Sequence, residues 1–167
     1  MRMLKPNPGE LVDRQSILEL KIDHSNVEFE GEKTEFQTGE GKKRSRVMQR
    51  TVVNKEALGT KVHLFFDELE LIQKHLIENW LPDIYNDDAK IEEYNKLFDE
   101  LSDTNSQLWD LEDQIRILKS APDPFQETAA KSAATVAFTI VDMNDKRAML
   151  VKKFNALWGI QSQEKLY

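Results

Sequence analysis

The stretch DAKIEEYNKLFDELSDTNSQLWDLEDQIRILK, residues 88–119, decides the fold. Apolar residues recur in it at steps of three and four, at Tyr94, Leu97 and Leu101, which is the spacing of one helix face. As a single helix the stretch would be ~48 Å long, at about 1.5 Å per residue. A helix of that length needs an equally long partner beside it. The sequence therefore predicts an all-α bundle of long helices.

Three other segments also show helical spacing. The first segment begins with signals of a helix N-terminus: Asn7 as the N-cap, Pro8 in the first turn and Glu10 as the acid of a capping box. The motif Asp123-Pro124-Phe125-Gln126 repeats this capping-box pattern before the last segment. The second segment alternates steps of three and four through Leu58, Val62, Phe65, Leu69, Ile72 and Leu76. We predict about four helices in a single domain, residues 1–167. The first lies near 8–26, the second starts between residues 54 and 60 and ends near 79, the third covers 88–119, and the fourth opens at the cap at Asp123 and ends before Gly159.

Residues 27–53 lack a helical period and contain three glycines. Residues 27–30 alternate like a strand and residues 50–53 are β-branched, so a ragged hairpin and a mobile loop both remain open. Five glutamates precede five basic residues here, which favours charge pairing within the segment over phosphate binding. We expect an irregular or hairpin insertion, most mobile at residues 30–46.

Charge and composition argue against several classes of site and of partner. The net charge of −7 argues against a nucleic-acid coat protein, which would be basic. The absence of cysteine excludes disulfides, thiolate zinc sites and cysteine nucleophiles. The longest stretch of low polarity, residues 133–141, is too short to span a bilayer, and the N-terminus has no secretion signal. We expect a cytoplasmic protein with neither membrane nor nucleic-acid partners.

The unequal helix lengths predict an oligomer. Two helices of about thirty residues beside two of about twenty leave apolar surface uncovered in a monomer. We therefore expect a homodimer that forms through the long helices.

Two polar residues fall on the predicted inner face of residues 88–119, namely Asn105 and Glu112. A buried carboxylate needs a partner, and Arg116 is one helical turn further on. An internal ion pair that fixes helix register is the favoured interpretation, and a ligand site in the bundle centre is the alternative. Removal of Arg116 should then cost on the order of 3 kcal/mol.

Pairs of aspartates at three-residue spacing occur twice, as Asp110 with Asp113 and as Asp142 with Asp145. Two such pairs on neighbouring helices could hold Mg²⁺ through oxygen ligands. The spacing is similar to that of the helical nucleotide pyrophosphohydrolases, but their doubled-glutamate signature is not clear here. Thirty acidic residues in 167 also produce such pairs by chance, so we assign no metal ligands. No catalytic triad, phosphate loop or glycine-rich nucleotide motif occurs, which leaves enzymatic activity open and any cofactor unknown.

Four segments taken in order carry a family resemblance: GELVDRQSILELK (9–21), LWDLEDQIR (108–116), VDMNDKRA (141–148) and EKLY (164–167). They resemble an uncharacterised family of small helical proteins from bacteria and their phages. Residues 27–53 fall outside the resemblance and look like an insertion. The family supplies no known activity. The resemblance implies that the polar positions inside these motifs matter, Asp13 among them.

The favoured hypothesis is a non-catalytic helical binding module for a small anionic, nucleotide-like ligand or a protein partner. A central polar cluster would form the site, with the cations meeting the ligand and the carboxylates positioning the cations. The predicted ligand-binding residues are Lys21, Asp110, Glu112, Asp113, Arg116, Asn144, Asp145 and Arg147. One alternative is a Mg²⁺-dependent hydrolase of nucleotides or nucleotide sugars, and the other is a structural subunit of an assembly.

Overall fold

A computed structural model describes residues 6–25, 29–30, 33–37, 43–47, 51–52 and 60–161 of the chain. Its helices are α1 (Pro8–Asp23), α2 (Thr60–Asn79), α3 (Asp88–Lys119) and α4 (Glu127–Leu157), with a short 3-10 helix η2 (Leu81–Asp83) between α2 and α3. The predicted all-α bundle is confirmed, and α3 has the bounds that its periodicity indicated.

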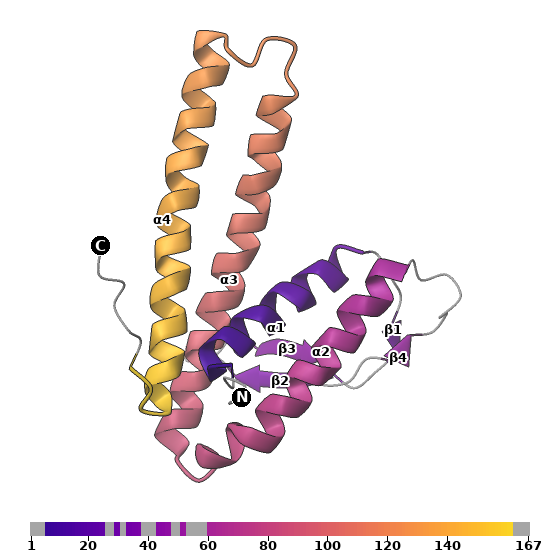
Figure 1. Ribbon diagram of the computed structural model, residues 1–167, viewed down its shortest axis with the longest axis vertical. Helices are drawn as coiled ribbons and strands as arrows, with labels where there is room; N and C mark the ends of the chain where they lie inside the picture. The colour runs from indigo at the N-terminus through magenta and orange to yellow at the C-terminus, as the bar shows by residue number, and fades with distance from the viewer. Residues whose placement is uncertain are drawn as a thin grey trace, which may run out of the picture.

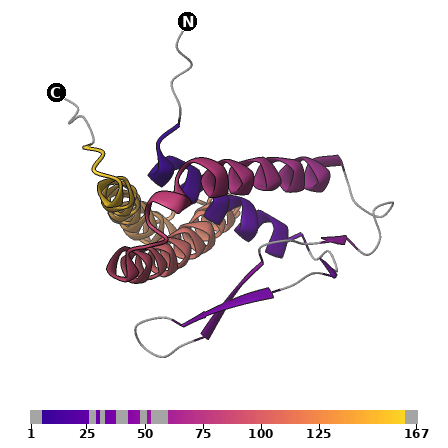
Figure 2. The same ribbon diagram turned by 90° about the horizontal axis from the view of Figure 1, so that it is seen from below.

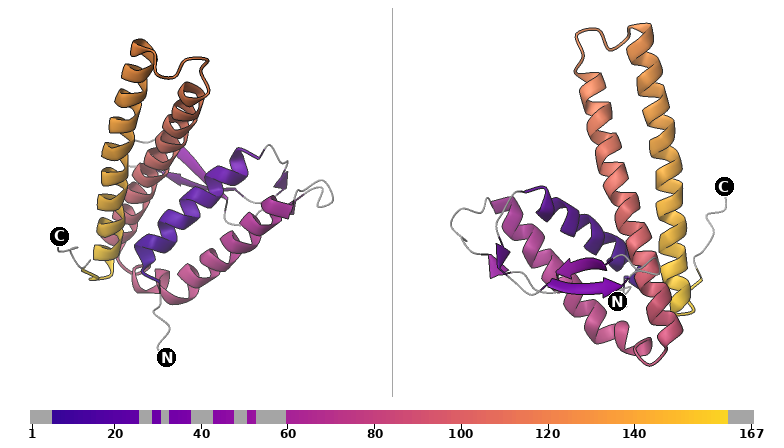
Figure 3. Two further views of the ribbon diagram at one scale, coloured as in Figure 1. Left: turned by 45° about the horizontal axis from the view of Figure 1, so that its top comes forward. Right: turned by 180° about the vertical axis from the view of Figure 1, so that it is seen from behind.

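The helices form two pairs of unequal length (Figure 1). Helices α3 and α4 run antiparallel along their whole length. Helix α1 packs against the lower half of both, and α2 packs on α1. The upper half of the α3–α4 hairpin extends beyond α1 and α2 in the views of Figures 1 and 3. We call this part, residues 110–142, the arm. Within the described residues, no helix is long and apolar enough to cross a membrane.

The hydrophobic core lies at the base, where all four helices meet. Tyr94 is central to it, with its ring edge-on to Phe154 at 5.5 Å and to Trp158 at 6.2 Å between centroids. Of the apolar stripe predicted for α2, Leu69, Ile72 and Leu76 are buried, Val62 and Phe65 are half-buried, and Leu58 lies outside the described residues. The stripe predicted for the first half of α3 is buried. The buried core residues are Val12, Leu18, Ile22, Leu69, Ile72, Leu76, Ile84, Tyr94, Leu97, Phe98, Leu101, Leu150 and Phe154.

The helix starts differ from the predicted caps. Pro8 does open α1, but the side chain of Asn7 makes no capping hydrogen bond. The Gly9 N–H, which such a cap could bind, instead donates to Asn155 Oδ1 at 2.8 Å. The predicted capping box before α4 is also wrong, because the helix begins at Glu127 without a side-chain cap. A capping side chain is found at α3 instead, where Asp87 accepts from the backbone N–H of Lys90 at 3.1 Å.

The insertion contains short antiparallel strands, which supports the hairpin interpretation. Strand β1 (Phe29–Glu30) pairs with β4 (Thr51–Val52), and β2 (Lys33–Gln37) pairs with β3 (Lys43–Val47). The strand-like residues 29–30 and the β-branched residues 51–52 are therefore each other's partners. In Figure 2 the strands lie beside α1, on the side away from α2. The predicted mobility of residues 30–46 concerns in part residues 31–32 and 38–42, which lie outside the described residues.

An ion pair joins α1 to α2 at the surface, and its contribution to stability should depend on pH. Arg14 Nε lies 2.6 Å from Glu68 Oε1, and Nη2 lies 3.1 Å from Oε2. The hydrogen bond from Arg14 is the main reason that the pKa of the Glu68 carboxyl is lowered below its ordinary value. Because that pKa is lowered on folding, the pair stabilises the protein above the ordinary carboxyl pKa. The contribution disappears as the pH falls through the lowered pKa.

We expect Glu68→Gln to reduce stability near neutral pH by under about 1 kcal/mol, since both side chains are half-exposed. The deficit should shrink as the pH falls through the lowered pKa of Glu68, and it should vanish at an acid pH below that pKa, where wild-type Glu68 is itself protonated. Thermal melts of both proteins at the two pH values measure this, with Glu70→Gln on the exposed side of α2 as control. A deficit that is independent of pH would contradict the assignment.

Candidate functional site

The three cations predicted to meet an anionic ligand occupy three separate settings. Lys21 Nζ lies over the ring of Phe65, 5.1 Å from its centroid. Arg116 is exposed and bonds to Glu112 and Asp113 of its own helix. Arg147 bonds to a carboxylate of α1. The contacts of these side chains therefore do not form one cationic cluster.

The predicted burial of Glu112 is wrong. Its side chain is 54% exposed and that of its partner Arg116 is 65% exposed. Glu112 lies in the arm, where α4 is the helix that packs on α3 and covers a narrow stripe of it. That stripe continues through the half-buried Leu111, Ile115 and Leu118. Asp110, Asp113, Asn144 and Asp145 are exposed as well.

A partly buried polar cluster, which we call the clamp, is formed by Asp13, Ser16, Asn105 and Arg147. Of the predicted ligand-binding residues, it contains Arg147 alone. Arg147 Nε donates to Asp13 Oδ1 at 2.9 Å, and its Nη2 donates to Oδ2 at 2.6 Å. Asn105 Nδ2 lies 3.1 Å from Asp13 Oδ1 and 3.2 Å from Ser16 Oγ. The side chains of Asp13 and Arg147 are 14% and 31% exposed, and Asn105 is buried, as predicted.

The clamp joins α1, α3 and α4 at one point. A bidentate guanidinium–carboxylate pair fixes both distance and angle, so the clamp holds α1 in register on the hairpin. An internal ion pair of this role was predicted, with Glu112 and Arg116 in place of Asp13 and Arg147. Since Asp13 already occupies two nitrogens of Arg147, we assign the clamp to the structure of the bundle and not to ligand binding.

The aspartate pairs considered for Mg²⁺ have no support in the geometry. Asp110, Asp113, Asp142 and Asp145 are all exposed. Across the described part of the chain, no three histidine, aspartate or glutamate side chains gather in a way that could hold a metal ion.

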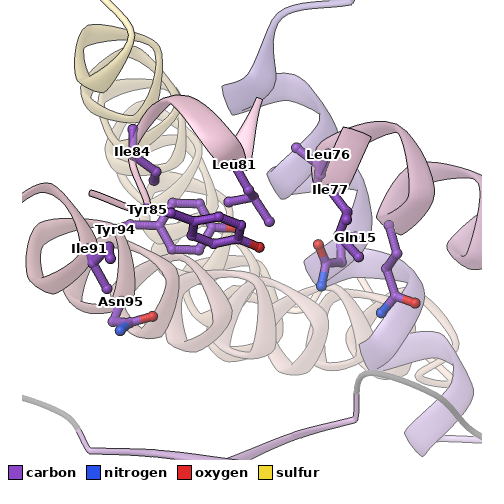
Figure 4. Close-up of a pocket in the computed structure, with 10 residues that line it drawn as sticks. Gln15, Leu76, Ile77, Leu81, Ile84, Tyr85, Ile91, Tyr94 and Asn95 are labelled. Carbon is purple, nitrogen blue, oxygen red and sulfur yellow. The ribbon is translucent and has the colours of Figure 1, made fainter. Parts of the chain in front are cut away.

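A pocket at the base of the bundle was missed by sequence reasoning. It lies between α1, α2, η2 and α3 and has a volume of about 170 Å³. The surrounding side chains come from all four of these elements (Figure 4). They are Gln15, Gln73, Leu76, Ile77, Leu81, Ile84, Tyr85, Ile91, Tyr94 and Asn95. The available signal was the run Trp80–Tyr85, which places apolar side chains in a break between two helices.

The chemistry of the pocket is apolar with carboxamide groups. Five aliphatic side chains and two tyrosines form its walls, and the amides of Gln15, Gln73 and Asn95 supply polar atoms. None of these lining residues carries a charge. Gln15 is buried, and its Nε2 donates to Glu19 Oε1 at 3.0 Å, which orients the amide. A site of this kind can surround a ring and form hydrogen bonds to its edge.

No protein family, characterised protein or solved structure matches this chain. The resemblance to a family of small helical bacterial and phage proteins therefore stays a prediction.

Proposed function

We propose that this chain is a non-catalytic helical binding module that takes the planar, uncharged ring of a small ligand in the α1–α2–η2–α3 pocket. The observation that carries the proposal is the pocket itself, an apolar concavity with a few convergent polar groups. Its volume of about 170 Å³ slightly exceeds the ~150 Å³ of a protein cavity that holds benzene. One six-membered ring with small substituents fits that space.

The lining residues indicate the edge chemistry of that ring. A carboxamide has both an acceptor oxygen and two N–H donors, so it pairs with a ring whose edge alternates C=O and N–H groups. The tyrosines offer aromatic faces for stacking or edge contacts. A nucleobase-like ring has both properties. Of the nucleotide-like ligand predicted from the sequence, the proposal keeps only the base-like ring.

The charge of the proposed ligand differs from that of the anionic ligand expected from the sequence. Lys21, Arg116 and Arg147 do not line the pocket. The turn and first helical turn beside it contain Asp83, Asp87 and Asp88. A phosphate group would therefore be disfavoured next to the pocket, and we propose a neutral ligand in place of an anionic one.

Thermal melts with three probes test the proposal. Uracil has the proposed edge, toluene has a similar size without polar groups, and inorganic phosphate carries only charge. We expect uracil to raise the melting temperature in a concentration-dependent way, since a ligand that binds only the folded state stabilises it. Toluene should raise it less, and phosphate should have no effect. Stabilisation by phosphate alone would instead support the anionic-ligand prediction.

Variants of the pocket locate the effect. Ile77→Trp fills the space from a side chain that is 43% exposed, so the fold should persist while the uracil shift is lost. Asn95→Leu should remove the advantage of uracil over toluene because it removes one amide. Gln107→Leu, an exposed position on the same helix, is the matched control and should leave both shifts unchanged. Equal uracil shifts in the wild type and Ile77→Trp would overturn the proposal.

A further inference from the structure

The arm exposes an apolar helix face. Residues 132–141 of α4, SAATVAFTIV, contain no charged residue on any side of the helix. Three of them, Ala133, Val136 and Ile140, are half-buried along the side that packs on α3. On the other sides Phe138 is 72% exposed and Val141 is 57% exposed. A helix segment without charge all round is normally covered on all sides, and this one is not.

The exposed apolar residues form a second stripe along α4. Phe138, Val141 and Met149 are its large members, and Met149 is 47% exposed. Small exposed residues continue the stripe at steps of three, four and seven, which is a coiled-coil spacing, at Ala130, Ala134, Ala137 and Ala148. The stripe lies on the side of α4 that faces away from α3. It is therefore available to another helix.

We propose that a second copy of this chain covers the stripe, with the two α4 helices antiparallel and crossing near Phe138. The positions of the charged residues favour a second copy as the partner and an antiparallel direction for the helix pair. Lys131 and Asp145 are each seven positions from Phe138, on opposite sides of it. In an antiparallel pair, Lys131 therefore faces Asp145 of the partner subunit, and the same contact repeats by symmetry. In a parallel pair, lysine would face lysine and aspartate would face aspartate.

The present contacts of Lys131 are compatible with this pairing. Its Nζ bonds to Glu127 of its own helix at 2.7 Å, with the lysine side chain 75% exposed. Exposed pairs of this spacing are weak, so Lys131 is free to reorient toward a partner. A bilayer is the poorer occupant, because Asp145 lies on the stripe itself, seven positions after Phe138 and four before Met149, and a carboxylate on a lipid-facing side is costly.

Single cysteines test both the contact and its direction, because the chain has no cysteine of its own. Ala137→Cys lies near the proposed crossing and should form a disulfide-linked dimer under mild oxidation. Glu127→Cys and Met149→Cys should each fail to crosslink alone, since equivalent positions would lie ~33 Å apart along the helix. A mixture of these two variants should crosslink. Self-crosslinking of each end variant, with none in the mixture, would overturn the antiparallel arrangement.

Sedimentation equilibrium provides the second test. The unmodified chain should approach twice its mass of 19.4 kDa with rising concentration. Phe138→Glu should raise the dimer dissociation constant at least tenfold. The matched controls Ile117→Glu on α3 and Leu71→Glu on α2 place the same charge at positions that are 71% and 67% exposed and should leave dimerisation intact. A mass of 19.4 kDa at all concentrations, or dimerisation that is lost in the controls but not in Phe138→Glu, would overturn the proposal.

Discussion

Replacing Arg147 with alanine should lower the free energy of unfolding by about 3 kcal/mol, whereas Arg116→Ala should change it by less than about 0.5 kcal/mol. The two arginines differ in what they leave behind. Loss of Arg147 leaves the Asp13 carboxylate, 14% exposed, with the Asn105 amide as the remaining donor of the clamp. Loss of Arg116 leaves two carboxylates that are already more than half exposed to water.

Urea unfolding of the two variants measures the difference, and further variants separate charge from shape. Arg147→Lys should recover only part of the loss, because an ammonium group cannot make the bidentate contact. The double variant Asp13→Leu with Arg147→Leu should be more stable than Arg147→Ala, since it leaves no unpaired buried charge. Equal losses in Arg147→Ala and Arg116→Ala would show that the clamp does not form in solution.

The parts of the fold that were predicted from the sequence depend on local spacing. The bounds of α3 follow from its periodicity, and the buried stripe of α2 through Leu69, Ile72 and Leu76 follows from steps of three and four. Asn105 could be placed inside because it continues the apolar stripe of Tyr94, Leu97 and Leu101, and it is buried. These inferences need no knowledge of which helices are neighbours.

The clamp and the pocket depend on which helices are neighbours. Asp13 and Arg147 are 134 positions apart, and periodicity within one helix cannot pair them. Glu112 continues the same stripe as Asn105, but α1 ends before it, so the residue lies in the arm and is exposed. The pocket depends on how η2 turns the chain between α2 and α3. The family resemblance singled out Asp13 and Arg147 as polar positions, but it did not indicate that they contact each other.

The N-terminus of α1 also depends on a contact with a distant helix, which periodicity does not reveal. This contact predicts a second large effect on stability. A cap by Asn7 was predicted from the local motif. In the fold, α4 approaches so closely that Asn155, which is buried, accepts the hydrogen bond from the Gly9 N–H. This approach requires glycine. A Cβ atom at position 9 would lie 2.5 Å from the Val151 carbonyl oxygen and 2.7 Å from Asn155 Oδ1.

We therefore expect Gly9→Ala to destabilise the protein by about 3 kcal/mol. Alanine favours a helix over glycine by at most about 1 kcal/mol, and by less in the first turn. Against this stand the overpacking of a tight contact, at about 1–3 kcal/mol, and the strain on a buried hydrogen bond, at about 1–3 kcal/mol. The steric terms are larger, so the net effect is a loss of stability. Urea unfolding measures it, with the exposed neighbour Glu10→Ala expected to stay within about 0.5 kcal/mol.

A double-mutant cycle assigns the cause of the Gly9 effect. Asn155→Ala removes one of the two obstructing groups, so Gly9→Ala should cost less in that background than in the wild type. It should still be destabilising there, because the Val151 carbonyl is backbone and cannot be removed. If Gly9→Ala were instead neutral or stabilising in the wild type, α1 would not lie this close to α4. The position of the clamp, one turn further along α1, would then also be in question.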